Sequence, residues 1–315
     1  MTADAGVDHA VTLEAMGSFY VGGRTIEVSD HEPRSVAISR DTHNYVHDPN
    51  GTYAIEHAYV AYFIPSGHST IPLVLVHGGG LTGACWESTP DGRPGWLTAF
   101  LRAGWPCYLI DNVERGRAGW CSLPGVWEGE PVLRSEQDCW TTFRIGLVED
   151  YSRRRPFAGS EFPVDALGEL TRQMVPRWTS TDQLAERALT AVVDRIGTCV
   201  LIGHSQGGGL SARVADARPD KVVASVVLEP AGLPATPPRR PQAIVLGDNR
   251  DKHPVTHQLS GVWDRYRDVA LEAGDCLTWL DLPTMGHTGN SHLFMCDLNS
   301  DQIAALVGDW LRTVL

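Results

Sequence analysis

The sequence has no long apolar run and no excess of basic residues. Its 315 residues include 26 Lys and Arg but 38 Asp and Glu, which gives a formal net charge of -12 at pH 7. This balance argues against a nucleic-acid partner, because binding to phosphates needs clustered Lys and Arg. No apolar stretch approaches the roughly 20 residues that a membrane-spanning helix requires. We therefore expect neither a nucleic-acid partner nor a membrane.

Cysteine pairs, metal motifs and a secretory leader are also missing. The seven cysteines are odd in number and are never spaced as C-x-x-C, so they indicate buried or free thiols rather than a disulfide framework or a zinc site. His43 and His47 lack the third ligand and the HExxH pattern that zinc would need. Residues 1–8 are polar and acidic, without the basic start and apolar stretch of a signal peptide. We expect a cytoplasmic protein with no metal and no organic cofactor.

Apolar strands and helices alternate along most of the chain. A hydrophobic fraction of 43% is sufficient for a large core, and this length is compatible with one α/β domain over 1–315. Short strands and hairpins are predicted at 15–30 and 51–65, and buried strands at 72–76, 106–110, 198–203, 222–228, 243–246 and 276–280. Helices are predicted at 96–103, near 135–147, 163–175 and 181–196, and at 210–218 and 300–315. The alternation predicts right-handed crossovers and a mostly parallel sheet with flanking helices.

One long segment interrupts this alternation. Residues 112–197 mostly lack strand character and contain several tryptophans and prolines. The part at about 122–180 is longer than a single crossover requires. We interpret it as a lid over the carboxyl ends of the strands, where ligands bind in such sheets. The alternative is that it only extends the helical layer.

The strongest functional signal is a G-x-S-x-G pentapeptide formed by Gly203, His204, Ser205, Gln206 and Gly207. It follows a buried strand and precedes a helix, and in that context the pattern predicts a nucleophile elbow. A cramped strand-to-helix turn exposes the serine hydroxyl, and the small residues on either side allow the turn to close. The alternative is a glycine-rich turn with an inert serine.

A glycine run after the first buried strand suggests an oxyanion hole. His77 is followed there by Gly78, Gly79 and Gly80. Acyl transfer places negative charge on the substrate carbonyl oxygen, and uncovered backbone N–H groups must stabilise it. We expect the amides of Gly79 and Gln206 to do so. A phosphate site would need the G-K-[ST] ending of a P-loop or the G-x-G-x-x-G spacing of a dinucleotide site, and the run has neither.

The general base and the acid each have two candidates. His292 lies a short loop before the closing helix, from which it can reach Ser205, whereas His287 lies nearer the last strand and could line the pocket. Glu229 ends an unbroken apolar strand, whereas Asp248 lies in a polar stretch. Either carboxylate preserves the chain order Ser, acid, His. The acid must be buried to hold the imidazole tautomer, which favours Glu229, and spacing favours His292.

These motifs resemble those of α/β-hydrolases, and more narrowly those of a small group of bacterial carboxylesterases with a cap before the nucleophile strand. The resemblance is carried by residues 17–23, 77–78, 81–83, 86–87, 89–93, 116–117, 162–164, 173–176, 204–206, 228–230 and 289–292. In that group the acid is a glutamate after the sixth strand, which implies Glu229, and the Asn-Ser-His match implies His292. One member of that group has cysteines where this chain has Gly79 and Gly80, so the resemblance does not imply a disulfide-stiffened oxyanion loop.

The sequence therefore predicts a serine hydrolase with Ser205 as nucleophile, His292 as base and Glu229 as acid. Its expected partner is a small-molecule ester or lactone. The same triad would serve an amidase, a thioesterase or a C–C bond hydrolase, and a hydrolase fold that only binds a ligand is a further alternative. Aromatic side chains in the lid would permit a homodimer without requiring one.

Overall fold

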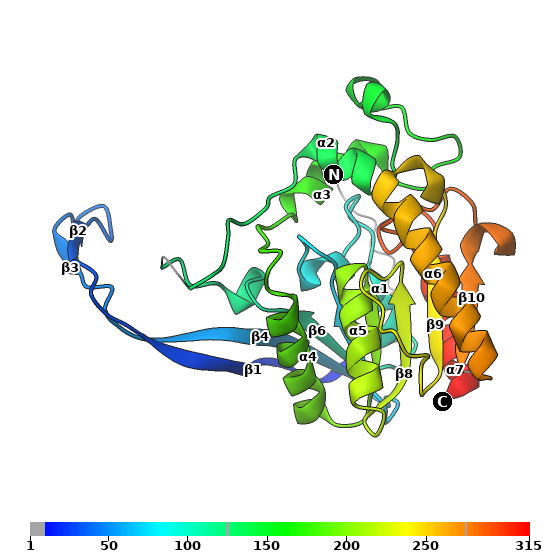
Figure 1. The fold of residues 1–315 in the computed structure, drawn as a ribbon, viewed down its shortest axis with the longest axis horizontal. Helices are drawn as coiled ribbons and strands as arrows, with labels where there is room; N and C mark the ends of the chain where they lie inside the picture. The colour runs from blue at the N-terminus through cyan, green and yellow to red at the C-terminus, as the bar shows by residue number, and fades with distance from the viewer. Residues whose placement is uncertain (1–9, 124–125, 275) are drawn as a thin grey trace.

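The computed structural model describes residues 10–123, 126–274 and 276–315 (Figure 1). The polar start expected at 1–8 lies outside these residues. An eight-stranded sheet, in the order β1-β4-β6-β5-β7-β8-β9-β10, forms the centre. Its strands are β1 (Leu13–Val28), β4 (Gly51–Pro65), β5 (Leu73–Val76), β6 (Cys107–Asp111), β7 (Cys199–His204), β8 (Val222–Leu228), β9 (Gln242–Leu246) and β10 (Leu277–Asp281). β4 pairs antiparallel with β1 and β6, and the remaining pairs are parallel, which confirms the predicted sheet.

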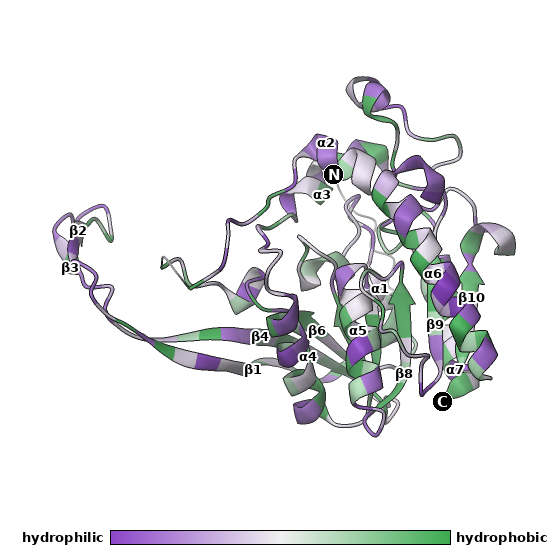
Figure 2. Ribbon diagram, viewed as in Figure 1, coloured by the Kyte–Doolittle hydropathy of each residue, from purple (hydrophilic) through white to green (hydrophobic). Residues whose placement is uncertain are grey.

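Alternate residues of the central strands face different helical layers. Leu73 and Leu75 of β5 belong to an apolar cluster with the helices α1 and α7, whereas Val74 and Val76 belong to a cluster with α4 and α5. Both faces are therefore covered, which explains the continuous apolar runs in the sequence. Figure 2 shows β8 as hydrophobic along its length, between helices with mixed faces. The helices concerned are α1 (Trp96–Arg102), α4 (Asp182–Ile196), α5 (Gln206–Ala217) and α7 (Ser300–Val314).

The N-terminal strands are longer than the short strands and hairpins predicted for them. β1 and β4 pair from Leu13 to Val28 and extend beyond the sheet as a ribbon, which ends in β2 (Arg34–Val36) and β3 (Tyr45–His47) (Figure 1). Gly22 and Gly23, a dipeptide typical of turns, have positive φ inside β1. Because glycine tolerates that conformation, the strand continues through the pair with a local irregularity.

A long helix lies where the sequence predicts none. The 20-residue α6 (Pro254–Ala273) follows β9 and precedes β10. Pro254 stands in its first turn, where a missing N–H costs no hydrogen bond. Trp263, Tyr266 and Ala270 are buried at helical spacing. The polar residues around these three positions hide that spacing in the sequence.

In its described residues, the segment interpreted as a lid contains only short helices. These are α2 (Glu136–Thr142), α3 (Leu167–Arg172) and two 3-10 turns, Val148–Arg153 and Val164–Ala166. α2 and α3 lie beyond the carboxyl ends of the parallel strands (Figure 1). Trp140 and Leu170 also belong to the apolar cluster that holds α1 and α7. The segment thus lies over the strand ends and shares the main core, and its role as a lid stays a prediction.

All seven cysteine thiols are free, and five of them are buried. Among the residues that the structure describes, no helix combines the length and the apolar character needed to span a membrane. No cluster of His, Cys, Asp or Glu that could hold a metal ion occurs in the same residues.

The packing of α5 predicts that Gly209 cannot be enlarged. A Cβ at Gly209 would overlap the carbonyl oxygen of Ala231, whereas a Cβ at Gly168 in α3 would meet open space. We expect Gly209→Ala to lower the free energy of unfolding by about 1–3 kcal/mol. Gly168→Ala, the matched control, should raise it by about 0.5–1 kcal/mol because alanine loses less backbone entropy. Urea denaturation measures both, and equal stability of the two variants would contradict this packing.

Candidate active site

Ser205 occupies the sharp junction between β7 and α5. Its φ of 53° and ψ of -116° are unfavourable for a residue with a side chain. A Cβ at Gly203 would overlap the carbonyl oxygen of Gly207, and one at Gly207 would overlap that of His77. The turn therefore needs the two glycines that the pentapeptide provides. Strain of this kind costs about 1–3 kcal/mol and persists where the surrounding structure enforces it.

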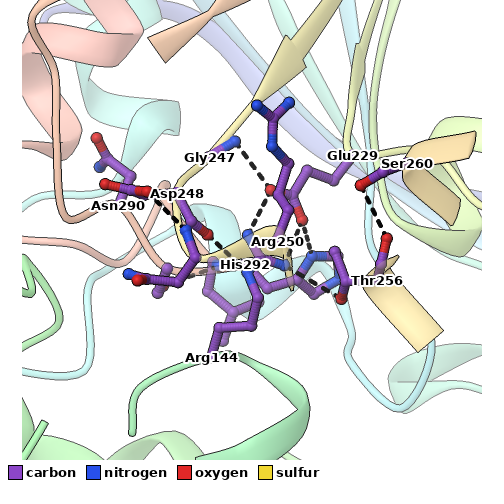
Figure 3. A network of polar contacts seen from close by, with 12 residues as sticks. Arg144, Glu229, Gly247, Asp248, Arg250, Thr256, Ser260, Asn290 and His292 are labelled. Carbon is purple, nitrogen blue, oxygen red and sulfur yellow. Dashed lines mark hydrogen bonds and ion pairs between the residues drawn. The ribbon is translucent and has the colours of Figure 1, made fainter. Parts of the chain in front are cut away.

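The structure brings Glu229 and His292 together from separate strand ends. Glu229 directly follows β8, and His292 lies in the loop between β10 and α7. The Nδ1 of His292 is 2.5 Å from the Oε2 of Glu229 (Figure 3). A carboxylate accepts hydrogen bonds only, so Nδ1 carries the proton and Nε2 is the basic nitrogen.

A third residue, Arg144, completes the charge arrangement. It follows α2 in the lid segment, and its side chain is fully buried. Its two terminal nitrogens donate to Glu229, Nη2 to Oε1 at 2.5 Å and Nη1 to Oε2 at 2.8 Å. The Gly247 N–H donates to Oε1 at 2.8 Å (Figure 3). Each carboxylate oxygen of Glu229 thus accepts two hydrogen bonds.

These contacts decide the ionisation of Glu229. Burial alone would raise its pKa, but the charges of Arg144 and His292 outweigh burial and hold the pKa well below its usual value. The carboxylate is therefore ionised at neutral pH. Because the pKa is lowered in the folded state, the associated stability is present above the ordinary value of 4.5 and is lost as the pH falls toward the folded-state pKa.

His204 links the serine to the loop that carries His292. Its Nε2 is 2.9 Å from the carbonyl oxygen of His292, and the two rings are 4.6 Å apart. Burial lowers the pKa of His204 well below its ordinary value, so the ring is neutral and Nε2–H donates to that carbonyl. Among the described residues, the Ser205 hydroxyl makes no hydrogen bond. Hydrogen bonds between a catalytic serine and its base are often long before substrate binds.

His77 fixes the peptide that presents the Gly79 amide. Its Nδ1 donates to the carbonyl oxygen of Gly78 at 2.9 Å, and its Nε2 accepts from the Asn112 N–H at 3.1 Å. Burial and the charge of Arg115 lower the pKa of His77 to about 4, so the ring is neutral and supports both bonds. Since C=O and N–H point in opposite directions across a trans peptide, the Gly79 N–H points away from His77.

The two expected oxyanion donors flank the serine. Gln206 is the first residue of α5, where the backbone N–H has no partner inside the helix. Gly78 lies against the nucleophile, because a Cβ on it would stand 3.2 Å from that of Ser205. Neither the Gly79 nor the Gln206 N–H donates to another group among the described residues.

The two alternative triad members lie outside the contact between Glu229 and His292. Asp248 accepts the Gly289 N–H at 3.0 Å and the Asn249 N–H at 2.7 Å, so it organises the loop before the histidine. His287 lies in the turn after β10, where its backbone N–H donates to Leu282.

Sequence reasoning missed Arg144. Its only local signal is its position between Phe143 and Ile145, both of which are buried. An arginine between two core residues needs a buried anion, but the sequence does not tell that this anion lies 85 positions later in the chain.

Comparison with known proteins places these features in context. The sequence profile of the Alpha/beta hydrolase family matches residues 73–313. A solved structure described as that of a novel bacterial esterase is 30% identical to this chain, with a TM-score of 0.84. The alignment covers 100% of this chain and 99% of the esterase. The probable secreted lipase phiG of a fungal species (strain ATCC 74256) is 32% identical over 212 residues, 63% of this chain. This alignment spans 57% of the length of that lipase.

The buried ion pair predicts a large effect of Arg144→Met on stability. Without its cation the Glu229 carboxylate is buried and unpaired, and we expect a loss of about 3–5 kcal/mol in the free energy of unfolding. Arg154→Met, which removes an exposed partner of Glu136 from the same segment, should cost less than about 1 kcal/mol. The double variant Arg144→Met, Glu229→Gln should recover part of the loss. Urea denaturation at neutral pH measures all three, and an unaltered Arg144→Met protein would contradict the pairing.

Proposed function

Because the chain belongs to the Alpha/beta hydrolase family, we propose that it is a serine hydrolase that cleaves a carboxylic ester or lactone. The observation that carries this proposal is the 2.5 Å contact between His292 and the ionised Glu229, with the His292 ring 4.6 Å from that of His204, which directly precedes Ser205. The choice of an ester rests on similarity to a bacterial esterase and a lipase. The predicted cytoplasmic location has no such support, since that lipase is described as secreted.

In the proposed reaction the Nε2 of His292 takes the proton of Ser205 as the hydroxyl attacks the substrate carbonyl. Glu229 holds the imidazole with Nε2 unprotonated and then stabilises the imidazolium. His292 returns the proton to the leaving alcohol, and an acyl-enzyme forms. Water activated by the same nitrogen then releases the acid and regenerates Ser205.

The backbone amides of Gly79 and Gln206 are assigned to the oxyanion in both steps. Both N–H groups are free of other acceptors in the described structure. Donors fixed before the reaction stabilise the developing charge without reorganisation, and one such donor contributes about 3–4 kcal/mol. The neutral ring of His77 holds the first of these peptides in place.

Replacement of the nucleophile tests the proposed function. Ser205→Ala should abolish hydrolysis of p-nitrophenyl esters and labelling by a fluorophosphonate probe, because only an activated serine reacts with that probe. Ser211→Ala, in the same helix, serves as the matched control and should still be labelled. Full ester hydrolysis by Ser205→Ala would refute the assignment.

A pair of substitutions separates the two candidate acids. Glu229→Gln leaves an amide that cannot hold His292 in the required tautomer as a carboxylate does, and we expect kcat to fall on the order of 10³- to 10⁴-fold. Asp248→Asn should change kcat by less than about tenfold, since its contacts are to backbone N–H groups. Steady-state ester hydrolysis gives both values, and circular dichroism verifies that each variant is folded. The opposite order of the two losses would reassign the acid.

A further inference from the structure

Two arginine side chains lie beside the oxyanion loop without the hydrogen bonds that buried guanidinium groups need. The guanidinium of Arg177 lies directly against Gly79: a Cβ on that glycine would overlap Nη1 and would stand 3.2 Å from Cζ. Among the described residues, Arg177 makes no side-chain hydrogen bond, and its Nε is buried without a partner. Its nearest carboxylate is that of Asp182, at 3.9 Å.

Arg115 is more deeply buried and equally short of partners. Its side chain is 3% exposed, and its Nε and Nη1 have no hydrogen-bond partner among the described residues. Only Nη2 has contacts, both long: 3.3 Å to Oε1 of Gln206 and 3.4 Å to Oε1 of Glu114. Arg115 and Arg177 thus converge on Gly79 and Gln206, the two residues assigned to the oxyanion hole.

The anions in this region do not fully compensate the two cations. Glu114 is buried beside Arg115, but its Oε1 already accepts from the Trp178 N–H at 3.0 Å and from the Thr181 hydroxyl at 2.9 Å. Asp182 is half-exposed, accepts from the Gln206 side chain, and is shared with Arg213 at 3.8 Å. Arg177 is therefore left with unused donors, and Asp182, its one ion-pair partner among the described residues, is 3.9 Å away, half-exposed and shared with Arg213.

We propose that Arg177, with the buried positive charge of Arg115 behind it, forms a carboxylate-binding subsite, so that the substrate is an ester or lactone that carries an ionised carboxylate close to its scissile carbonyl. This inference rests on the proposed function and specifies its substrate class. A planar guanidinium fork matches a carboxylate in a bidentate manner. Arg115 is paired with Glu114, whereas the charge of Arg177 is only partly offset by the shared Asp182, which suits a monoanion. Because Arg177 lies against Gly79, a carboxylate bound to it would be within a few bonds of the carbonyl carbon that Ser205 attacks.

Matched substrates test this subsite on both sides of the scissile bond. On the acyl side, mono-4-nitrophenyl glutarate carries a carboxylate where 4-nitrophenyl valerate has a methyl group. On the alcohol side, 4-acetoxybenzoate is compared with its methyl ester. We expect the wild type to prefer the anion in one of these pairs by about tenfold or more in kcat/KM, and the preferred pair identifies which side of the substrate carries the carboxylate.

Substitution of Arg177 supplies the decisive comparison. Arg177→Met should lower kcat/KM for the preferred anion by about 10- to 100-fold, mainly through KM, and change the neutral partner by less than about threefold. Arg177→Lys, which keeps the charge but not the fork, should lose less. Arg187→Met removes the same charge from the exposed surface of α4, where it lies 3.8 Å from Glu56, and should leave both values unchanged. Because the Arg177 side chain makes no hydrogen bond to the described structure, we expect the variants to fold, and thermal melting verifies this.

The outcomes separate this inference from the proposed function. Normal fluorophosphonate labelling with no preference for either anion would overturn the subsite and leave the serine hydrolase intact. An equal loss of kcat for anionic and neutral esters in Arg177→Met would also overturn it, because Arg177 would then act on the oxyanion or on the fold. No turnover of any of the four esters, together with no labelling of Ser205, would overturn the proposed function itself.

Discussion

The carboxylate of Glu229 is completely enclosed by protein, and such a charge is tolerated only when its neighbours compensate it. Arg144, the Gly247 amide and His292 do so together, because each of the two oxygens accepts two hydrogen bonds from them. Without them, desolvation would keep the group protonated, and a protonated acid could not orient the imidazole. The position of His292, the choice of its basic nitrogen and the link between lid and sheet all depend on this one buried charge.

The same residues carry backbone strain. Ser205, Glu229 and Arg144 all have positive φ, at 53°, 43° and 58°. Conformations of this kind cost about 1–3 kcal/mol each for residues with side chains and persist only where the surrounding contacts enforce them. The serine lies between two glycines that cannot be enlarged, and the other two residues form the buried ion pair. The favourable packing of the core thus offsets the strain at Ser205, Glu229 and Arg144.

Much of this arrangement could be predicted from the sequence, for identifiable reasons. The elbow and the glycine run are local patterns in which spacing alone determines backbone geometry, so Ser205, Gly79 and Gln206 could be identified from their immediate neighbours in the chain. Glu229 could be preferred over Asp248 because an apolar strand precedes it. The family resemblance then supported the same choices for Glu229 and His292.

Other features were beyond such reasoning, because they depend on contacts between distant parts of the chain. Arg144 looks like any arginine until the fold brings it to Glu229. The ribbon of β1 and β4 was underestimated because Gly22 and Gly23 resemble a turn, and α6 was missed because its buried positions are separated by polar residues. The unpaired donors of Arg115 and Arg177 are visible only when every neighbouring oxygen is known.

The place of Arg144 in the chain limits how the segment over the strand ends can move. This arginine belongs to the segment that covers the strand ends, whereas the carboxylate that it neutralises belongs to the sheet. An outward movement of the whole segment would separate Arg144 from Glu229, and the cost of a buried carboxylate without its cation would oppose that movement. We therefore expect substrate to enter through a smaller movement of another part of this segment, while the residues around Arg144 stay in place.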